Sequence, residues 1–140
     1  MHPILRNILA VVAGLIVGLL VNKALVNLGP QLIPPPEGAD ITSMEGLKST
    51  IHLMQPKHFL MPFLGHALGT LVGAALAAYL AVGNKMRPAM VVAAFFLLGG
   101  ISMVYMLPSS PMWFNVADLG LAYLPMGWLG HRLTGGNKSW

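Results

Sequence analysis

The chain has 140 residues, of which 56% are hydrophobic and 9% are charged, whereas charged residues make up about 25% of an ordinary soluble domain. This composition excludes an ordinary soluble domain and predicts one integral membrane domain over residues 1–140. The sequence contains no cysteine, which excludes disulfides, thiolate metal sites and cysteine nucleophiles. The formal net charge of +4 comes from basic residues that separate apolar runs and form no stripe, so we expect no nucleic-acid partner.

The first apolar run covers residues 4–28 and predicts an uncleaved transmembrane helix. It is longer than the apolar core of a secretory signal, and no small-residue cleavage site precedes its end. Ala10, Gly14 and Gly18 recur at every fourth position. In lipid, such a face of small residues allows a second helix backbone to approach closely.

Residues 29–57 form the only long predicted loop, and a short amphipathic helix is expected within it. Thr42 and Glu45 match a capping box, in which each side chain satisfies a free backbone donor at a helix start. Apolar residues then follow at helical spacing, namely Met44, Leu47, Ile51 and Met54. We expect this helix to lie on the bilayer surface or to fold over the bundle, with a moving lid as the alternative.

The second predicted span, residues 58–82, carries two distinct stripes. As a helix, its 25 residues would extend about 37 Å, enough to cross a hydrocarbon core of about 30 Å with some tilt. Small residues recur at every fourth position, namely Gly65, Gly69, Gly73 and Ala77. We expect this stripe to pack against the small-residue face of the first span. The neighbouring stripe carries His58, His66 and Thr70 into the membrane.

Two further apolar runs complete the predicted fold. The third span covers residues 89–107 and follows a basic turn that contains Lys85 and Arg87. The fourth covers residues 112–133, with a kink expected at Pro125. The predicted fold class is therefore all-α: an integral membrane four-helix transmembrane bundle with a short external amphipathic helix between spans one and two.

The distribution of charge predicts the orientation of this bundle. Five of the eight basic residues fall on one side, namely Arg6, Lys85, Arg87, Arg132 and Lys138. The positive-inside rule places that side, with both termini, in the cytoplasm, and the loop 29–57 outside. We expect a multi-pass protein of a bacterial-type plasma (inner) membrane.

Polar side chains from four predicted helices reach the outer half of the bundle. Asp118, the only acidic residue within a span, lies about 10 Å from the outer side, and His66 lies about 13 Å from it. Because a central carboxylate costs about 3 kcal/mol on insertion scales, Asp118 should face the interior and find a partner. The other members of this candidate ligand- or proton-binding site are Lys23, Asn115, Tyr105 and His58.

Two roles remain open for the His66–Asp118 pair. It is either a structural hydrogen bond that fixes helix register or a site that handles a proton, ion or ligand. Asn115, one helical turn from Asp118, is expected to satisfy a remaining lone pair of the carboxylate. If His66 is not the partner of Asp118, Lys23 takes its place.

Metal and enzyme chemistry have little support in the sequence. His58 and His66 are two helical turns apart, about 12 Å, so they cannot bind one ion on a continuous helix. We therefore expect no metal and no cofactor. Ser109 and Ser110 lack the GxSxG motif of a nucleophile elbow.

The sequence thus predicts a small transporter or channel-like protein that moves a small solute or ion through a proton-linked site. The alternative is a non-catalytic scaffold or accessory subunit of a larger membrane complex. A membrane enzyme acting on a lipid or quinone headgroup is a distant third. The expected partners are the lipid bilayer and either further copies of this chain or a larger membrane protein.

Overall fold

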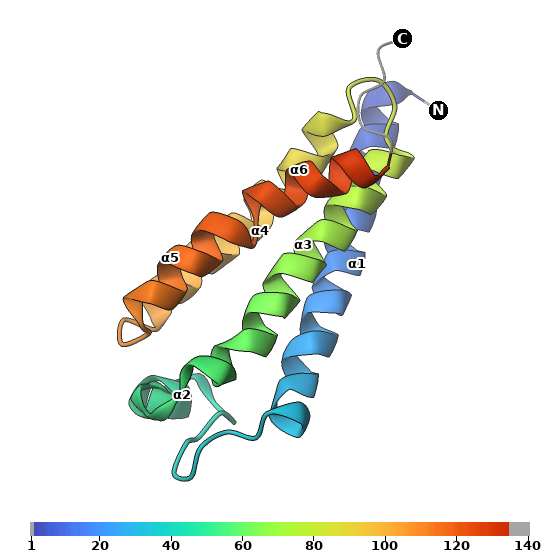
Figure 1. Cartoon of the computed structure of the whole chain (residues 1–140). Helices are drawn as coiled ribbons and strands as arrows, with labels where there is room; N and C mark the ends of the chain where they lie inside the picture. Colours follow the sequence, from blue (N-terminus) through green and yellow to red (C-terminus); the bar gives the residue numbers. More distant parts are fainter. Residues whose placement is uncertain (1, 135–140) are drawn as a thin grey trace.

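The computed structural model describes residues 2–134, and all of the regular secondary structure in that range is helical (Figure 1). Three segments are long and apolar enough to cross a membrane: α1 (Pro3–Leu32), α4 (Met86–Met106), and α3 (Leu60–Leu80) with the 3-10 turn η2 (Pro56–Phe59) before it. The predicted all-α class is confirmed, and the three apolar segments are compatible with the predicted membrane protein. Lys138, counted above for the orientation, lies outside the described residues.

The shorter elements lie at one end of the molecule or along α4. They are α2 (Met44–Thr50), the 3-10 turn η1 (Ile51–Leu53), α5 (Met112–Leu121) and α6 (Leu124–Leu133). Figure 1 shows α1 beside α3, and α5 running along α4. The two pairs converge at the end that contains the α3–α4 turn, here called the closed end. They diverge at the opposite end, where α2 lies, here called the open end.

Small residues allow the backbones of α1 and α3 to touch. A Cβ atom added at Gly18 would lie 2.7 Å from the carbonyl oxygen of Gly69. One added at Gly73 would lie 2.6 Å from the carbonyl oxygen of Gly14. Real Cβ atoms do not approach backbone oxygens this closely, so these positions admit only glycine at the present helix separation.

The start of α1 also satisfies the exposed carbonyls at the end of α3. The Arg6 Nε atom donates to the Leu80 carbonyl at 2.8 Å. The Asn7 side chain donates to the Val82 carbonyl at 3.1 Å and accepts from the Val82 amide at 2.8 Å. Because the last carbonyls of a helix lack intrahelical partners, these bonds fix the register of the pair at the closed end.

The last helix, α6, completes the packing of the closed end. A Cβ atom at Gly130 would lie 2.8 Å from the Leu71 carbonyl oxygen of α3, and one at Gly127 would lie 2.6 Å from the Ala93 side chain of α4. The fully buried residues around them are small as well, namely Ala74, Ala77, Ala78, Ala89 and Val92. The closed end is therefore a close-packed core of alanine and glycine.

The fourth predicted span, residues 112–133, is interrupted in the structure. Instead of one kinked helix, α5 ends at Leu121, two non-helical residues follow, and α6 begins at Leu124. Pro125 explains the interruption, because it has no amide hydrogen for the Leu121 carbonyl and its ring clashes with that carbonyl. The break turns Tyr123 into the interior, where it is 3% exposed.

The start of α2 differs from the predicted capping box by one residue. Ser43, not Thr42, is the N-cap, and its side chain accepts from the Gly46 amide at 3.0 Å. Thr42 instead donates from its hydroxyl and its amide to the Asp40 carboxylate. These two hydrogen bonds lower the pKa of Asp40 below its ordinary value, and the bond from the Thr42 hydroxyl has the larger effect.

The apolar residues of α2 and η1 pack against the rest of the protein. They cluster with Phe59, Leu107 and Phe114. Ser109 in the α4–α5 turn adds a hydrogen bond to the Lys48 carbonyl at 3.3 Å. In this structure the segment therefore lies over the open end of the helices.

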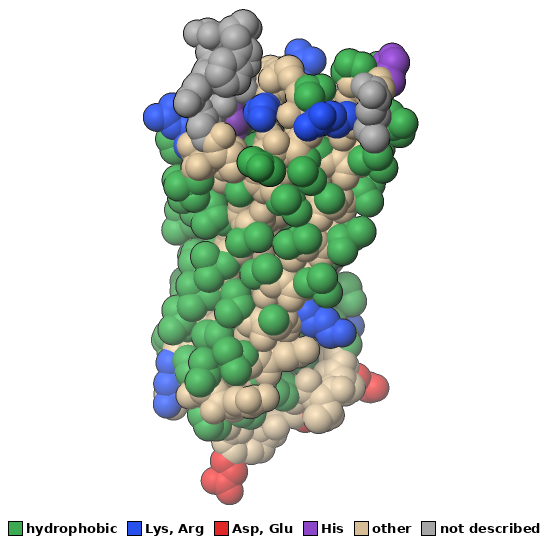
Figure 2. All heavy atoms as spheres, turned by 90° about the vertical axis from the view of Figure 1, so that its right-hand side faces the viewer, with side chains coloured by type: hydrophobic (Ala, Val, Ile, Leu, Met, Phe, Trp, Pro, Cys, Tyr) green, Lys and Arg blue, Asp and Glu red, His purple; other side chains and the backbone are tan. Residues whose placement is uncertain are grey.

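The outer surface has the distribution of polarity expected of a membrane protein. Figure 2 shows hydrophobic side chains over the middle of one face, with most of the visible Lys and Arg at one end and Asp and Glu at the other. On α1 alone, Ile4, Ile8, Ile16, Leu20 and Leu32 are each more than half exposed. Exposed residues of this kind are suited to contact with lipid.

The contact between α1 and α3 predicts that even one added methyl group destabilises the fold. We expect Gly73→Ala to lower the free energy of unfolding by about 1–3 kcal/mol, because the methyl group forces the helices apart. Gly99→Ala is the matched control, since a Cβ atom there meets no atom within 4 Å and alanine favours a helix by about 1 kcal/mol. Unfolding of both variants in detergent, followed by circular dichroism, measures the difference. Equal stability of the two variants would contradict close backbone packing.

Candidate functional site

A hydrogen bond joins His66 of α3 to Asp118 of α5. The distance between His66 Nδ1 and Asp118 Oδ1 is 2.8 Å. Asp118 is only 5% exposed, while the side chain of His66 keeps 23% of its surface accessible. The structure thus brings together the two residues that were paired in the sequence because they lie at similar distances from the outer side on antiparallel helices. The contact itself does not assign a role to the pair.

Tyr123 is a third member of this cluster, and the sequence analysis missed it. Its hydroxyl donates to Asp118 Oδ2 at 3.0 Å, and its ring stacks on the His66 imidazole with centroids 5.8 Å apart. Gly100 of α4 makes room for the ring, because a Cβ atom there would lie 2.6 Å from the Tyr123 hydroxyl oxygen. Pro125 was the available signal, since the break before it turns Tyr123 toward Asp118.

The hydrogen bond to Asp118 determines the tautomer of a neutral His66 ring. An ionised carboxylate only accepts hydrogen bonds, so with Asp118 ionised, Nδ1 of His66 carries the hydrogen and donates it. The lone pair of the neutral ring then lies on Nε2, which no described residue hydrogen-bonds. Nε2 is therefore the ring nitrogen of His66 that remains available to a further hydrogen-bond partner.

A cavity of about 390 Å³ opens beside this cluster at the open end of the bundle. Segments of α1, α3, α4 and α5 form its walls, and residues of α2 and the turns around it line one side. Most lining side chains are apolar. The polar exceptions are Asn27, Lys57, His58, His66, Ser110, Asn115 and Asp118. This combination of an apolar wall and a few converging polar groups is typical of small-molecule sites.

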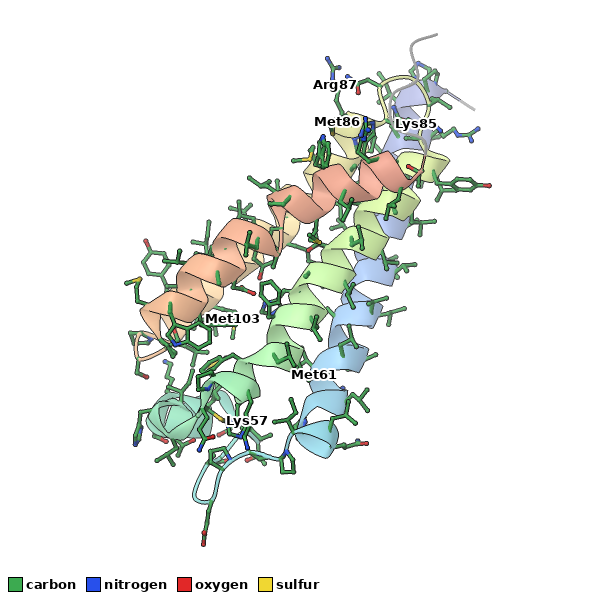
Figure 3. All side chains as sticks on the ribbon, in the orientation of Figure 1. Lys57, Met61, Lys85, Met86, Arg87 and Met103 are labelled. Atoms are coloured by element: carbon green, nitrogen blue, oxygen red, sulfur yellow. The ribbon has the colours of Figure 1, made fainter. Side chains whose placement is uncertain are left out.

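Figure 3 places three residues of this outer cavity on separate elements. Lys57 of η2, Met61 of α3 and Met103 of α4 all lie toward the open end, where the helix pairs diverge. Lys85, Met86 and Arg87 lie at the closed end. The basic turn is therefore far from the outer cavity.

The other predicted site residues are not part of the Asp118 cluster. Asn115 accepts from the Ser110 hydroxyl at 3.0 Å, and Tyr123 takes the place at Asp118 that Asn115 was expected to fill. Tyr105 is 83% exposed and Lys23 is also exposed; neither lines this cavity. Lys23 is therefore not the partner of Asp118 in this structure.

His58 lines the cavity but has a local structural contact at both ring nitrogens. Its Nδ1 accepts from the Gln55 amide at 2.9 Å, and its Nε2 lies 3.0 Å from the Pro34 carbonyl oxygen, to which it donates. It thereby caps η2 and ties it to the proline-rich loop. Within residues 2–134, no group of three or more His, Asp or Glu side chains is arranged to hold a metal ion.

The buried hydrogen bond from Tyr123 predicts a specific loss of stability. Tyr123→Phe should lower the free energy of unfolding by about 1–3 kcal/mol, because one oxygen of Asp118 loses its donor. Tyr105→Phe removes the same hydroxyl from an exposed ring and should leave stability unchanged. Reversible unfolding in mixed detergent micelles compares the two. If Tyr105→Phe costs as much as Tyr123→Phe, the Tyr123–Asp118 bond does not stabilise the fold.

Comparison with known proteins adds no assignment to this geometry. No family model, curated protein or solved structure matches the chain. A functional interpretation therefore depends on the His66–Asp118–Tyr123 cluster, the cavity beside it and the distribution of charge along the bundle.

Proposed function

We propose that this chain is a small polytopic transporter or channel-like protein that moves a small solute or ion across a bacterial-type inner membrane. Its proton-linked site is the cluster of His66, Asp118 and Tyr123. In this proposal, α1, α3, α4 and the pair α5–α6 cross the membrane, the open end faces outward, and both termini are cytoplasmic. The working unit is a homo-oligomer or a complex with a larger membrane protein.

The lengths and charges of the elements support this topology. The two ten-residue helices α5 and α6 add up to about 30 Å, the thickness of a hydrocarbon core. Arg6, Lys85 and Arg87 belong to the closed end, whereas Glu37, Asp40 and Glu45 precede or belong to α2 at the open end. A closed end facing the cytoplasm satisfies the positive-inside rule.

The single observation that supports transport is the access of the outer cavity to the buried carboxylate. Asp118 and His66 both line a cavity of about 390 Å³. A transporter requires a path from the outside to its polar site, whereas a scaffold has no need for one. A cavity at this position therefore favours transport over the scaffold alternative.

The chemistry of the cluster supports a link to protons. Imidazole is the side chain whose ordinary charge change lies near neutral pH, and the imidazole of His66 is hydrogen-bonded to Asp118 at 2.8 Å. A change of charge at His66 alters the binding of any polar solute in the cavity. Proton and solute binding are then coupled through one side chain.

The proposed topology predicts which positions a membrane-impermeant maleimide reaches. Because the natural chain has no cysteine, single substitutions report their own location without background. In intact cells, Glu37→Cys should be labelled and Asn84→Cys should react only after the membrane is permeabilised. The opposite pattern would reverse the orientation, and labelling of both positions in intact cells would contradict the four-crossing arrangement.

The proposed proton link predicts that Asp118→Asn abolishes proton movement in a protein that stays folded. In liposomes with a pH-sensitive dye and an imposed proton gradient, we expect at least about a tenfold fall in flux, which corresponds to about 1.4 kcal/mol. The amide retains a hydrogen-bond acceptor but cannot stabilise an imidazolium ion by charge. Glu37→Gln makes the same change on an exposed loop residue and should conduct like the unmodified chain. Flux equal to that of empty liposomes in the unmodified chain would favour the scaffold alternative.

A further inference from the structure

A second, smaller cavity adjoins the outer cavity at His66. It has a volume of about 210 Å³ and lies between α1 and α4, with residues of α3 and Tyr123 also lining it. His66, Gly100 and Met103 line both cavities. The second cavity, here called the side crevice, is half open, and Leu19 and Gly99 among its lining residues are exposed. It therefore opens sideways, between α1 and α4.

The outer cavity and the side crevice together form one groove along α4. The residues of α4 that line them recur at intervals of three and four, so they share one helix face, namely Phe96, Gly99, Gly100, Met103, Val104 and Leu107. This face extends about 16 Å, from the rise per residue of an α-helix. Toward the closed end, Gly18 of α1 packs on the Phe96 ring, since a Cβ atom added at Gly18 would lie 2.9 Å from it. The groove is therefore elongated and ends at Phe96.

The charged groups around the groove favour an anionic ligand. Lys57, at the open end (Figure 3), is the only Lys or Arg among the lining residues, and no Asp or Glu of residues 2–134 forms an ion pair with it. Asp118 is 5% exposed, and each of its oxygens already has a hydrogen-bond partner in His66 or Tyr123. No other Asp or Glu of the chain lines either cavity. A cationic head group would therefore find no free carboxylate, whereas an anionic one would find the ammonium group of Lys57.

We propose that the groove binds an anionic amphiphile with a single apolar chain, and that this molecule is the solute of the proposed function, on which that role rests. Its head group pairs with Lys57, and its chain runs past His66 into the side crevice. An apolar cavity of about 150 Å³ holds one benzene molecule, so the side crevice, at about 210 Å³, has room for one chain segment and not for two. In the proposed topology the crevice opens toward hydrocarbon, so the chain enters from the bilayer.

Photo-cross-linking in phosphatidylcholine vesicles tests this site. The probe is a dodecyl sulfonate, permanently anionic, with a diazirine at the far end of its chain. Peptide mass spectrometry should find Phe96, which lines the crevice, labelled above Phe95, which is 57% exposed and reports labelling from the surrounding bilayer. The same chain with a trimethylammonium head should label Phe96 about tenfold less, because like charges repel at Lys57. Equal labelling of Phe96 by the two probes would contradict an anionic ligand.

A matched pair of lysine variants tests the head-group contact. Lys57→Gln should reduce the labelling of Phe96 by the sulfonate about threefold, the effect expected of one exposed ion pair. Lys48→Gln removes the same charge from an exposed residue of α2 that lines neither cavity and should leave the labelling unchanged. If both variants are labelled like the unmodified chain, Lys57 does not bind the head group and the proposal is wrong.

A matched pair of glycine variants tests the path of the chain. A Cβ atom at Gly99 or at Gly120 would meet no atom within 4 Å, so leucine at either position is compatible with the fold. Gly99→Leu places its side chain at the side crevice and should reduce the labelling of Phe96 about tenfold. Gly120 lines neither cavity, so Gly120→Leu should be labelled normally. Equal labelling of the two variants would show that the chain does not enter the crevice.

Competition identifies the class of amphiphile, and proton flux separates this site from the proposed function. Unlabelled dodecanoate should displace the probe, whereas phosphatidylglycerol added to the vesicles, with two chains, should not; equal displacement would overturn a single-chain ligand. If Asp118→Asn abolishes proton flux as predicted but labelling is independent of Lys57 and Gly99, the amphiphile site is wrong and the proton-linked function stands. If labelling depends on both residues but the unmodified chain moves no protons, the binding site stands and the proposed function is wrong.

Discussion

A buried carboxyl group must find its hydrogen-bond partners inside the protein, and much of this fold serves that requirement. Asp118 receives one donor from His66 and another from Tyr123. The first contact requires α3 and α5 to run side by side. The second requires the break before Pro125 and the absence of a side chain at Gly100. A single buried carboxyl group thus constrains three helices and one interruption.

The helix α3 combines this polar contact with close packing on a neighbouring face. Gly69 and Gly73 bring its backbone against α1, and Gly130 brings α6 against it near the closed end. Where these small residues meet, no room remains for a solute. Toward the open end the helices separate and leave the outer cavity. The arrangement is therefore asymmetric along its axis, with a close-packed half and a half that contains the outer cavity.

The segment over the open end matters because it forms part of the outer cavity. Ile51 packs with Phe59 and Leu107, which ties α2 and η1 to the ends of the spans. Leu47, Ile51 and Met54 also line the cavity. Glu45, Lys48 and Ser49 on the outer face of this segment are exposed, and its apolar face covers the ends of the helices. It therefore shapes access to His66 as well as covering apolar surface.

Local patterns in the sequence were sufficient to predict the apolar helices, the small-residue faces of α1 and α3, and the apolar residues of α2. Helical period, residue size and charge are properties of neighbouring positions, so they can be recognised in a single chain. The pairing of His66 with Asp118 also followed from depth alone, since both lie at fixed distances from their helix ends. The N-cap at Ser43 could not be predicted in this way, because Thr42 donates both of its hydrogen bonds to Asp40 in the preceding loop.

Only the tertiary structure brought Tyr123 into the site, removed Asn115, Lys23 and Tyr105 from contact with Asp118, and revealed two cavities that meet at His66. These features depend on how far each helix is rotated about its axis and where the last one breaks. Rotation is decided by the packing of all the helices together, here through Gly100, Gly127 and Gly130. The sequence by itself therefore determined which side chains enter the bundle and at what depth, while their facing partners were decided by helix packing, which no local pattern contains.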